Sequence, residues 1–232
     1  MIKLFFKDSE LKIEKNTPLI EIVKQLNLTE PHVGLGIFVN GELKDFSYVL
    51  QDQDHVEVLS FDDPMGKKIF WHTSAHVLAQ AILRLFPDAT PTIGPPIEEG
   101  FYYDFANLHI SIEDFPKIEK EIKAVLKENF KSEKLVFASK KEAIDAFKGN
   151  PYKKEIIQEI PDGESLTAYR QGEFFDLCRG PHLYNLGKIK AFKLLKVSGA
   201  YWRGKSENEM LTRIYGISFP NKDMLKDYLF RL

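Results

Sequence analysis

The sequence has a single cysteine, no long apolar run and no excess of basic charge. One cysteine cannot form an internal disulfide, so Cys178 is a free thiol, a ligand or part of a pocket wall. No apolar run approaches the roughly 18 residues that a membrane span requires. A formal net charge of -2 argues against non-specific coating of nucleic acid, because such binding depends on many basic contacts to phosphate. We expect a globular cytoplasmic protein that does not contact a membrane.

The chain has 232 residues, of which 44% are hydrophobic, and this is enough to bury one large or two smaller domains. Its patterning predicts an α+β fold in four parts. A small β-grasp, ubiquitin-like unit is followed by a linker with proline and glycine, and then by a larger α+β domain with an antiparallel sheet and packed helices. A last segment begins a further helix. These parts are residues 1–61, 62–66, 67–220 and 221–232.

The β-grasp prediction depends on the order of patterns in residues 1–61. Alternating apolar positions predict two strands, and Thr17-Pro18 predicts the start of a helix. Asn40-Gly41 between two apolar segments is a strong hairpin signal, because this turn needs residues that tolerate positive φ. Val56 and Val58 complete the pattern as a last strand.

In the larger domain, short patterns predict further elements. Gly100-Phe-Tyr-Tyr-Asp-Phe105 is an aromatic strand, and Asp114-Phe-Pro116 opens a long helix. Ser139 and Glu142 fit a capping box for a short helix that ends at Gly149. Phe174-Phe175, residues 191–197 and residues 210–215 are predicted as strands of one antiparallel sheet.

Two short motifs contain half of the histidines and the only cysteine: His72-Thr-Ser-Ala-His76 and Asp176-Leu-Cys178-Arg-Gly-Pro-His182. Helical positions four apart lie on one face, and the apolar spacing after the first motif predicts an amphipathic helix, so its two histidines should point the same way. The Gly-Pro pair excludes a helix in the second motif and predicts a strand end with a tight turn. Such a loop could face the histidine helix across a pocket.

The residue types in these motifs are consistent with two kinds of site. Two histidines, a cysteine and a third histidine are competent zinc ligands, and three of them with an open position would form a Lewis-acid hydrolase. Imidazole, with a reference pKa of about 6.5, also suits the activation of water without a metal. The residues alone leave both alternatives open.

A basic run follows the second motif. From Leu177 to Ser206 there is no acidic residue. One interpretation is a solvated face of alternating lysines. The position directly after the Cys-His motif favours an anionic ligand beside the pocket. The basic residues are Arg179, Lys188, Lys190, Lys193, Lys196, Arg203 and Lys205.

Six motifs occur in the order in which one protein family has them. They are His72-x-x-x-His76, Ile93-Gly94-Pro95, Gly100-Phe-Tyr-Tyr-Asp104, Asp176-x-Cys178-Arg-Gly-Pro-His182, Gly199-Ala-Tyr-Trp-Arg-Gly204 and Arg213-Ile-Tyr-Gly216. Together they resemble the N-terminal half of bacterial threonyl-tRNA synthetases. Residues 1–61 are similar to the TGS domain of this family, and residues 67–220 to its editing domain, which alanyl-tRNA synthetases share in outline.

The resemblance implies an aminoacyl-tRNA hydrolase that proofreads. Its substrate would be the ester of mischarged Ser-tRNA(Thr), recognised at the aminoacylated 3′ end of tRNA(Thr). The class II catalytic core of the family would follow residue 232, with residues 221–232 beginning a helix toward it. Because the chain has no P-loop or other nucleotide cradle, we do not expect it to aminoacylate.

The resemblance and the chemistry of ester hydrolysis also assign roles to polar residues. His72 is the first candidate for positioning or activating water, and His76 and His182 would complete a polar pocket. Lys153, which matches the lysine of the family's Tyr-Lys motif, could polarise the ester or hold a ribose oxygen. Asp176 could orient a histidine or recognise the ammonium group of the substrate. Structural alternatives are a core histidine, a solvated lysine and a turn-capping aspartate.

Cys178 is expected to shape the pocket wall rather than to attack the ester. Aromatic and basic side chains could bind the tRNA end by stacking on bases and contacting phosphate. By strand alternation only one of Tyr102 and Tyr103 can face the pocket, and Tyr103 is favoured. Strand aromatics can equally belong to the core. The candidate substrate-binding residues are Gly94, Tyr103, Tyr201, Trp202 and Arg203.

The resemblance also bears on the metal. Alanyl-type editing domains carry this ligand set with zinc, whereas threonyl-type domains are regarded as working without it. We therefore expect no metal, and zinc at His72, His76, Cys178 and His182 is the alternative. Two other functions stay open: a zinc-dependent trans-acting aminoacyl-tRNA deacylase, and a non-catalytic tRNA-binding or regulatory module.

Overall fold

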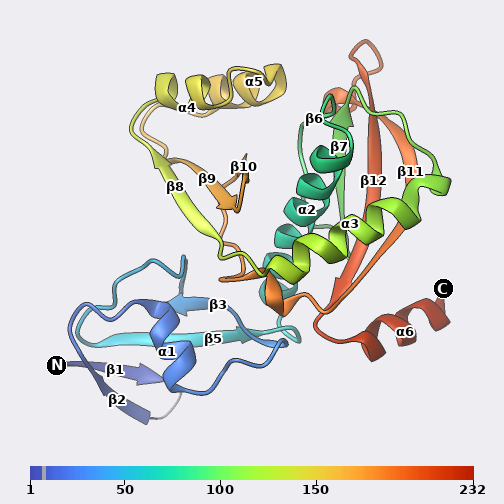
Figure 1. Ribbon diagram of the computed structural model, residues 1–232. Helices are drawn as coiled ribbons and strands as arrows, with labels where there is room; N and C mark the ends of the chain where they lie inside the picture. Colours follow the sequence, from blue (N-terminus) through green and yellow to red (C-terminus); the bar gives the residue numbers. More distant parts are fainter. Residues whose placement is uncertain (7–8) are drawn as a thin grey trace.

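The computed structural model describes residues 1–6 and 9–232, which form a mixed α and β structure (Figure 1). The expected combination of helices and antiparallel sheets is confirmed. Within the described ranges, no helix is both long enough and apolar enough to cross a membrane.

The N-terminal unit is a five-stranded sheet covered by one helix. The strand order is β2-β1-β5-β3-β4, with β1 parallel to β5 and the other pairs antiparallel. The predicted hairpin forms, with φ of 53° at Asn40 and 79° at Gly41. The elements are β1 (Ile2–Phe6), β2 (Ser9–Ile13), α1 (Leu19–Gln25), β3 (Val33–Val39), β4 (Glu42–Lys44) and β5 (Asp54–Ser60).

Helix α1 begins later than the sequence predicts. Pro18 is its N-cap and makes no side-chain cap hydrogen bond. The Thr17 hydroxyl donates instead to the carbonyl of Glu14, at 2.7 Å. The buried side chains Leu19 and Ile22 pack into the core of this unit.

The stretch 62–66, predicted as a linker, differs in the structure because helix α2 (Pro64–Leu85) begins inside it. Pro64 suits a first helical position, which needs no backbone N–H donor. Leu35 and Leu59 of the N-terminal unit share a buried cluster with Ile69 of α2. The helix therefore packs directly against the N-terminal unit.

Helix α2 is also not amphipathic. Its buried residues run almost without interruption from Ile69 to Ile82, on all sides of the helix. It lies between α3 (Phe115–Glu128) and a four-stranded antiparallel sheet, and it contacts both. The prediction of a single buried apolar stripe is therefore wrong, because the polar residues Thr73, Ser74 and Gln80 are buried here too.

The remaining strands form two sheets rather than one. The four-stranded sheet has the order β11-β12-β7-β6, and a three-stranded sheet has the order β10-β9-β8. Phe174-Phe175 thus lies apart from residues 191–197 and 210–215, because β10 pairs with β9 across a two-residue turn. The strands are β6 (Thr90–Pro91), β7 (Phe101–Ala106), β8 (Glu133–Phe137), β9 (Leu166–Gln171), β10 (Phe174–Leu177), β11 (Ala191–Tyr201) and β12 (Met210–Phe219).

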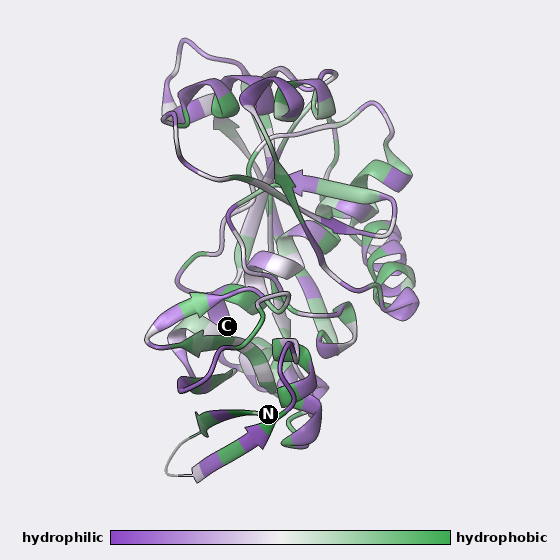
Figure 2. Ribbon diagram, turned by 90° about the vertical axis from the view of Figure 1, so that its left-hand side faces the viewer, coloured by the Kyte–Doolittle hydropathy of each residue, from purple (hydrophilic) through white to green (hydrophobic). Residues whose placement is uncertain are grey.

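Two helices, α4 (Lys140–Ala146) and α5 (Pro151–Glu159), cover the three-stranded sheet at the top of Figure 1. Ser139 caps α4 by accepting a hydrogen bond from the backbone N–H of Glu142, although the helix ends at Ala146, before the predicted Gly149. In Figure 2 both helices are largely hydrophilic, with apolar residues on part of their surface. Asn150 caps α5 and so places Lys153 in its first turn. Helix α6 (Lys222–Arg231) ends the described chain.

Lys188 joins the N-terminal unit to the rest of the protein. Its ammonium group donates hydrogen bonds to the carbonyls of Val33 at 2.6 Å, Glu30 at 2.8 Å and Thr29 at 3.2 Å. The side chain is buried, and burial lowers its pKa to about 8. This lysine of the basic run therefore serves a contact between units rather than an anionic ligand.

Candidate functional site

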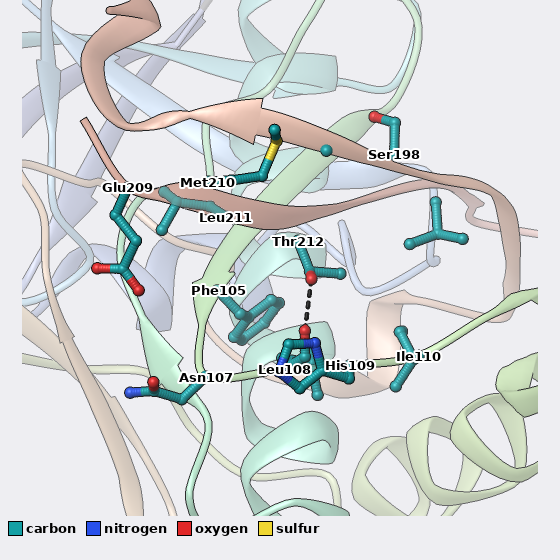
Figure 3. A pocket seen from close by; sticks show the side chains of 12 residues that line it. Phe105, Asn107, Leu108, His109, Ile110, Ser198, Glu209, Met210, Leu211 and Thr212 are labelled. Carbon is teal, nitrogen blue, oxygen red and sulfur yellow. Dashed lines mark hydrogen bonds between the residues drawn. The ribbon is translucent and has the colours of Figure 1, made fainter. Parts of the chain in front are cut away.

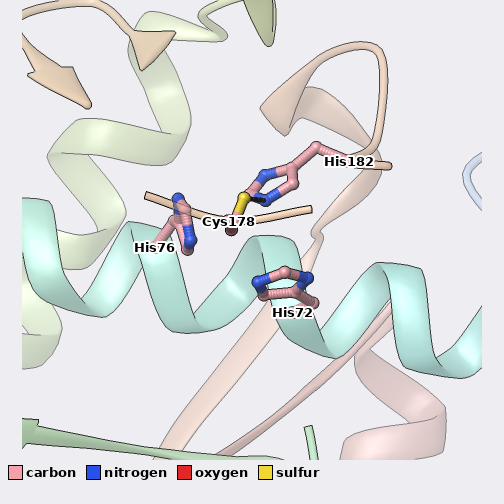
Figure 4. Close-up of side chains that lie close together, drawn as sticks. All are labelled: His72, His76, Cys178 and His182. Atoms are coloured by element: carbon pink, nitrogen blue, oxygen red, sulfur yellow. Dashed lines mark hydrogen bonds between the residues drawn. The ribbon is translucent and has the colours of Figure 1, made fainter. Parts of the chain in front are cut away.

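Three histidines and the cysteine come together beside helix α2 (Figure 4). The rings of His72 and His76, one turn apart, have centroids separated by 5.1 Å. The ring of His182, from the loop after β10, lies 4.7 Å from His72 and 4.2 Å from His76. Cys178 Sγ is 3.3 Å from His182 Nε2. One ligand atom from each residue lies within 4.8 Å of all the others.

Backbone contacts hold the loop that carries Cys178 and His182. The backbone N–H of Cys178 donates to the carbonyl of Thr167 at 3.1 Å, and the Thr167 hydroxyl donates to the carbonyl of Cys178 at 2.7 Å. Gly180 has a φ of 64°, and a Cβ there would lie 2.3 Å from the Tyr169 ring. Only glycine fits this position, so the Gly-Pro sequence brings the loop back toward α2.

A buried ion pair lies next to the histidines. Lys153 Nζ is 2.5 Å from Asp176 Oδ1, which also accepts a hydrogen bond from the backbone N–H of Leu177 at 2.8 Å. The hydroxyl of Tyr103 donates to the other carboxylate oxygen, Oδ2. His76 Nε2 is 3.8 Å from Oδ2, which is too far for a hydrogen bond. Three donors therefore fix the orientation of Asp176.

Burial keeps the three histidines and Cys178 uncharged. It lowers the pKa of His72 to about 4, although the Asp176 carboxylate acts in the opposite direction. Burial and the neighbouring histidines lower the pKa values of His76 and His182 well below their ordinary range. Burial raises the pKa of the Cys178 thiol, so this residue is a weak nucleophile.

A cavity of about 490 Å³ opens onto these residues. Its polar lining consists of His72, His76, Lys153, Asp176 and Arg179. The segment 93–96 forms an apolar wall, where a Cβ on Gly94 would lie 2.1 Å from the ring of Tyr103. The wall is therefore rigid and has no space for a larger residue.

Another cavity, of about 460 Å³, lies at the end of the four-stranded sheet (Figure 3). His109 is exposed at its margin, and the hydroxyl of Thr212 donates to the carbonyl of Leu108. The described residues that line it include none of the predicted site residues. We therefore place the candidate site at the histidine cavity.

The predicted stacking residues lie elsewhere. Tyr103 is 0% exposed, so its ring cannot stack on a base, although it holds Asp176. Trp202 is buried, with its Nε1 3.2 Å from a carboxylate oxygen of Glu155. Arg203 pairs with Glu155 at 2.6 Å. Tyr201 is 40% exposed but does not line the histidine cavity. Trp202 and Arg203 thus support α5 from outside the cavity.

The basic run is not one open face. Lys193 pairs with Glu119 at 2.9 Å, and Arg179 pairs with Glu164 at 2.8 Å. These acidic partners come from distant parts of the chain, which a count of local charges does not include. Arg179 also lines the histidine cavity, and an anionic ligand beside the pocket stays a prediction.

A row of rings and cations on the four-stranded sheet was not predicted. Lys196 Nζ lies 4.3 Å from the centroid of the Tyr215 ring, whose own centroid is 5.8 Å from that of Tyr102. The Arg213 guanidinium lies 3.8 Å above the Tyr102 ring. The backbone N–H of Tyr102 donates a hydrogen bond to the carbonyl oxygen of Pro95 in the cavity wall, at 3.4 Å. Adjacent residues of a strand point to opposite sides of the sheet, so the inward position of Tyr103 places Tyr102 on this outer face.

The histidine and cysteine side chains could also bind a metal ion. Neutral imidazoles and a thiol that can lose its proton are the donors that zinc prefers. The Nδ1 atoms of His76 and His182 are buried without a hydrogen-bond partner in the described part of the chain. The donor set therefore fits zinc.

The comparison with protein families gives one match. Residues 166–215 match the family described as the threonyl and alanyl tRNA synthetase second additional domain. This segment includes β9, β10 and the loop with Cys178 and His182.

Curated relatives extend the similarity over most of the chain. The threonine–tRNA ligase of Protochlamydia amoebophila is 62% identical over 212 residues, which are 91% of this chain and 33% of that protein. That of Chlamydia caviae is 47% identical over 232 residues, 100% of this chain and 36% of that protein. The threonine–tRNA ligase of Caldanaerobacter subterraneus is 48% identical over 221 residues, which are 94% of this chain and 34% of that protein. The chain spans about a third of the length of these relatives, and the matches fit an editing region of a threonyl-tRNA synthetase.

Proposed function

We propose that this chain hydrolyses the ester of Ser-tRNA(Thr), as the editing region of a threonyl-tRNA synthetase. The observation that carries the proposal is the convergence of His72, His76, Lys153 and Asp176 on one cavity. Residues 1–61 are proposed as its TGS-like β-grasp unit, because their strand and helix order suits that fold.

A separate hydrolytic site has a physical reason. Serine lacks one methyl group of threonine, and a pocket distinguishes such a difference by only about 1–3 kcal/mol. A second site that excludes the larger amino acid raises the selectivity. The rigid wall at Gly94 and Tyr103 is suited to this exclusion.

His72 is proposed to position the attacking water. It is only partly buried and lines the cavity, and its pKa of about 4 keeps the imidazole neutral at pH 7. A neutral imidazole accepts a hydrogen bond from water and orients its oxygen toward the ester carbon. His76 and His182 complete the polar surroundings.

Lys153 and Asp176 are proposed to act on the substrate's charges. The ammonium of Lys153 can stabilise the oxyanion that develops on the ester or hold a ribose oxygen. A carboxylate accepts about four hydrogen bonds, and three donors already contact Asp176, so one position is left for the ammonium of serine.

The tRNA partner is proposed to approach over the row of Lys196, Tyr215, Tyr102 and Arg213. Aromatic rings stack on unpaired bases, and the ammonium of Lys196 contacts phosphate, whereas the guanidinium of Arg213 is paired with Asp104 at 2.7 Å and holds the Tyr102 ring. The link from Tyr102 to Pro95 connects this row with the cavity wall. This assignment replaces Tyr103, Trp202 and Arg203 as contacts to the tRNA end.

The reaction is proposed to proceed without a metal. In its support, the neutral imidazole of His72 and the ammonium of Lys153 line the same cavity, so the chain's own residues supply a group to position water and a cation for the oxyanion. In the alternative, His72, His76, Cys178 and His182 would hold zinc, which supplies Lewis-acid polarisation and a more acidic water.

The deciding experiment compares deacylation of Ser-tRNA(Thr) and Thr-tRNA(Thr) by the purified chain, with and without a chelator. We expect selective loss of serine with the chelator present. Loss of activity on chelation and recovery with zinc would support the zinc-dependent deacylase. Binding of tRNA without hydrolysis would support the non-catalytic module.

A further inference from the structure

Tyr169 packs flat against one of the site histidines. Its ring centroid is 4.4 Å from that of His182, and the two planes differ by 11°. Tyr169 is 2% exposed and lies on β9. His182 Nε2 lies 3.3 Å from the Cys178 sulfur, and its Nδ1 has no hydrogen-bond partner among the residues described. Packing against Tyr169 is therefore a main restraint on the plane of this imidazole.

The hydroxyl of Tyr169 reaches the N-terminal unit. It donates a hydrogen bond to Asp45 Oδ2 at 2.6 Å. The second carboxylate oxygen of Asp45, Oδ1, accepts from the backbone N–H of Ser47 at 2.9 Å and from its hydroxyl at 2.6 Å. The turn after β4 thus fixes Asp45, and Asp45 in turn fixes Tyr169.

The space around Tyr169 leaves it few alternative positions. A Cβ on Gly180 would lie 2.3 Å from its ring, so the loop that carries His182 touches the same ring from another side. Burial and the nearby carboxylate raise the pKa of the Tyr169 hydroxyl, which keeps it a donor. One side chain therefore contacts both the N-terminal unit and the site loop.

We propose that Asp45 is a positioning residue for the hydrolytic site: through the Tyr169 hydroxyl it sets the plane of the Tyr169 ring and with it the orientation of His182. This inference rests on the proposed function. It gives the N-terminal unit a part in hydrolysis without any contact to the substrate, and the site is incomplete without that unit.

The test uses Asp45→Ala, Tyr169→Phe and the double variant in the full chain. Tyr169→Phe keeps the ring and removes only the hydroxyl. We expect each single variant to lower kcat for Ser-tRNA(Thr) by about tenfold, with KM unchanged, because small misplacements of a site residue reduce the rate strongly. The double variant should show no further loss, because both changes remove one interaction.

Ser47→Ala is the matched control, because it removes only the hydroxyl's hydrogen bond to Asp45 Oδ1 and leaves both the backbone N–H bond to that oxygen and the bond to Tyr169. It should retain kcat. Asp45→Asn keeps an accepting oxygen and should recover most of the activity lost in Asp45→Ala. Additive losses, or wild-type kcat in Tyr169→Phe, would overturn the proposal.

A second readout does not depend on hydrolysis. The ring signals of His182 in an NMR spectrum of histidine-labelled protein should shift in Asp45→Ala and in Tyr169→Phe, and stay in place in Ser47→Ala. If the wild-type chain hydrolyses nothing, the proposed function fails while these shifts still decide the structural coupling. Unchanged His182 signals in both variants would contradict it.

Discussion

Lys153 and Asp176 form an ion pair with 2.5 Å between Nζ and Oδ1, and neither side chain is more than 4% exposed. Desolvation of two charges offsets much of their attraction, so such a pair adds little net stability, whereas either charge alone is strongly unfavourable. The pair therefore holds a cation and an anion at defined positions beside the histidines.

Replacement of Lys153 by methionine should destabilise the fold and abolish hydrolysis. The change leaves the Asp176 carboxylate buried without its cation, which typically costs about 3–5 kcal/mol. Urea denaturation measures the loss. Lys154→Met, at the next position on α5, is the control and should stay within about 1 kcal/mol of wild type. Equal stability of the two variants would contradict the assigned role of the pair.

His72→Ala should reduce deacylation of Ser-tRNA(Thr) by about a hundredfold or more, the usual contribution of a residue that positions or activates water. The fold should persist because His72 is only partly buried at the cavity. Single-turnover hydrolysis measures the effect. His109→Ala, in the exposed margin of the other cavity (Figure 3), is the control. Undiminished hydrolysis by His72→Ala would remove the central assignment.

The stability of the metal-free protein should decrease as the pH falls from 6.5 to 4. In this range the unfolded chain binds a proton at His72, whose ordinary pKa is 6.5, while the folded protein with a pKa of about 4 does not. This difference between the folded and unfolded pKa values corresponds to about 3 kcal/mol in the free energy of unfolding. The contribution is fully present above pH 6.5 and is lost as the pH falls toward 4. His76 and His182 act with the same sign.

Denaturation at several pH values tests this dependence on His72. His72→Asn should lose less stability between pH 6.5 and 4 than wild type does. Identical pH profiles for the two proteins would show that the folded-state pKa of His72 is not depressed.

Gly94→Ala should destabilise the protein by about 1–3 kcal/mol, the typical cost of overpacking a core. The new Cβ would lie 2.1 Å from the Tyr103 ring, which is fully buried and holds Asp176. The rate of Ser-tRNA(Thr) hydrolysis should also fall, because a displaced Tyr103 no longer holds Asp176 in place. Gly149→Ala is the control, because nothing lies within 4 Å of a Cβ there. Thermal unfolding compares the two variants.

Tyr102→Ala and Lys196→Glu should weaken binding of tRNA(Thr), each by about 1–3 kcal/mol if the ring stacks on a base and the ammonium contacts phosphate. Lys120→Glu is the control, because Lys120 is exposed on α3, away from the row on the sheet. Titration at two salt concentrations separates the two contributions, since only the lysine contact is strongly salt-dependent. Unchanged affinity in both variants would exclude this face.

Much of the local structure follows from the sequence. Asn40-Gly41 predicts its hairpin because few other residue pairs adopt positive φ twice, and Ser139 with Glu142 predicts the start of α4 for a similarly local reason. Sheet membership was harder to predict. The sequence patterns do not indicate β8 and β9, and they place β10 in the wrong sheet, because pairing partners depend on contacts between distant segments.

For the candidate site, too, some features follow from the local sequence and others only from the tertiary structure. Spacing along the chain already predicts that His72 and His76 share a helix face and that the Gly-Pro turn carries Cys178 and His182, because helix period and turn chemistry are local properties. Only the tertiary structure decides that Tyr103 is buried under Asp176, that Arg203 is paired with Glu155, and that the imidazoles are neutral. Exposure, pairing and charge state depend on which distant side chains displace water around a residue, and the linear order of residues does not contain that information.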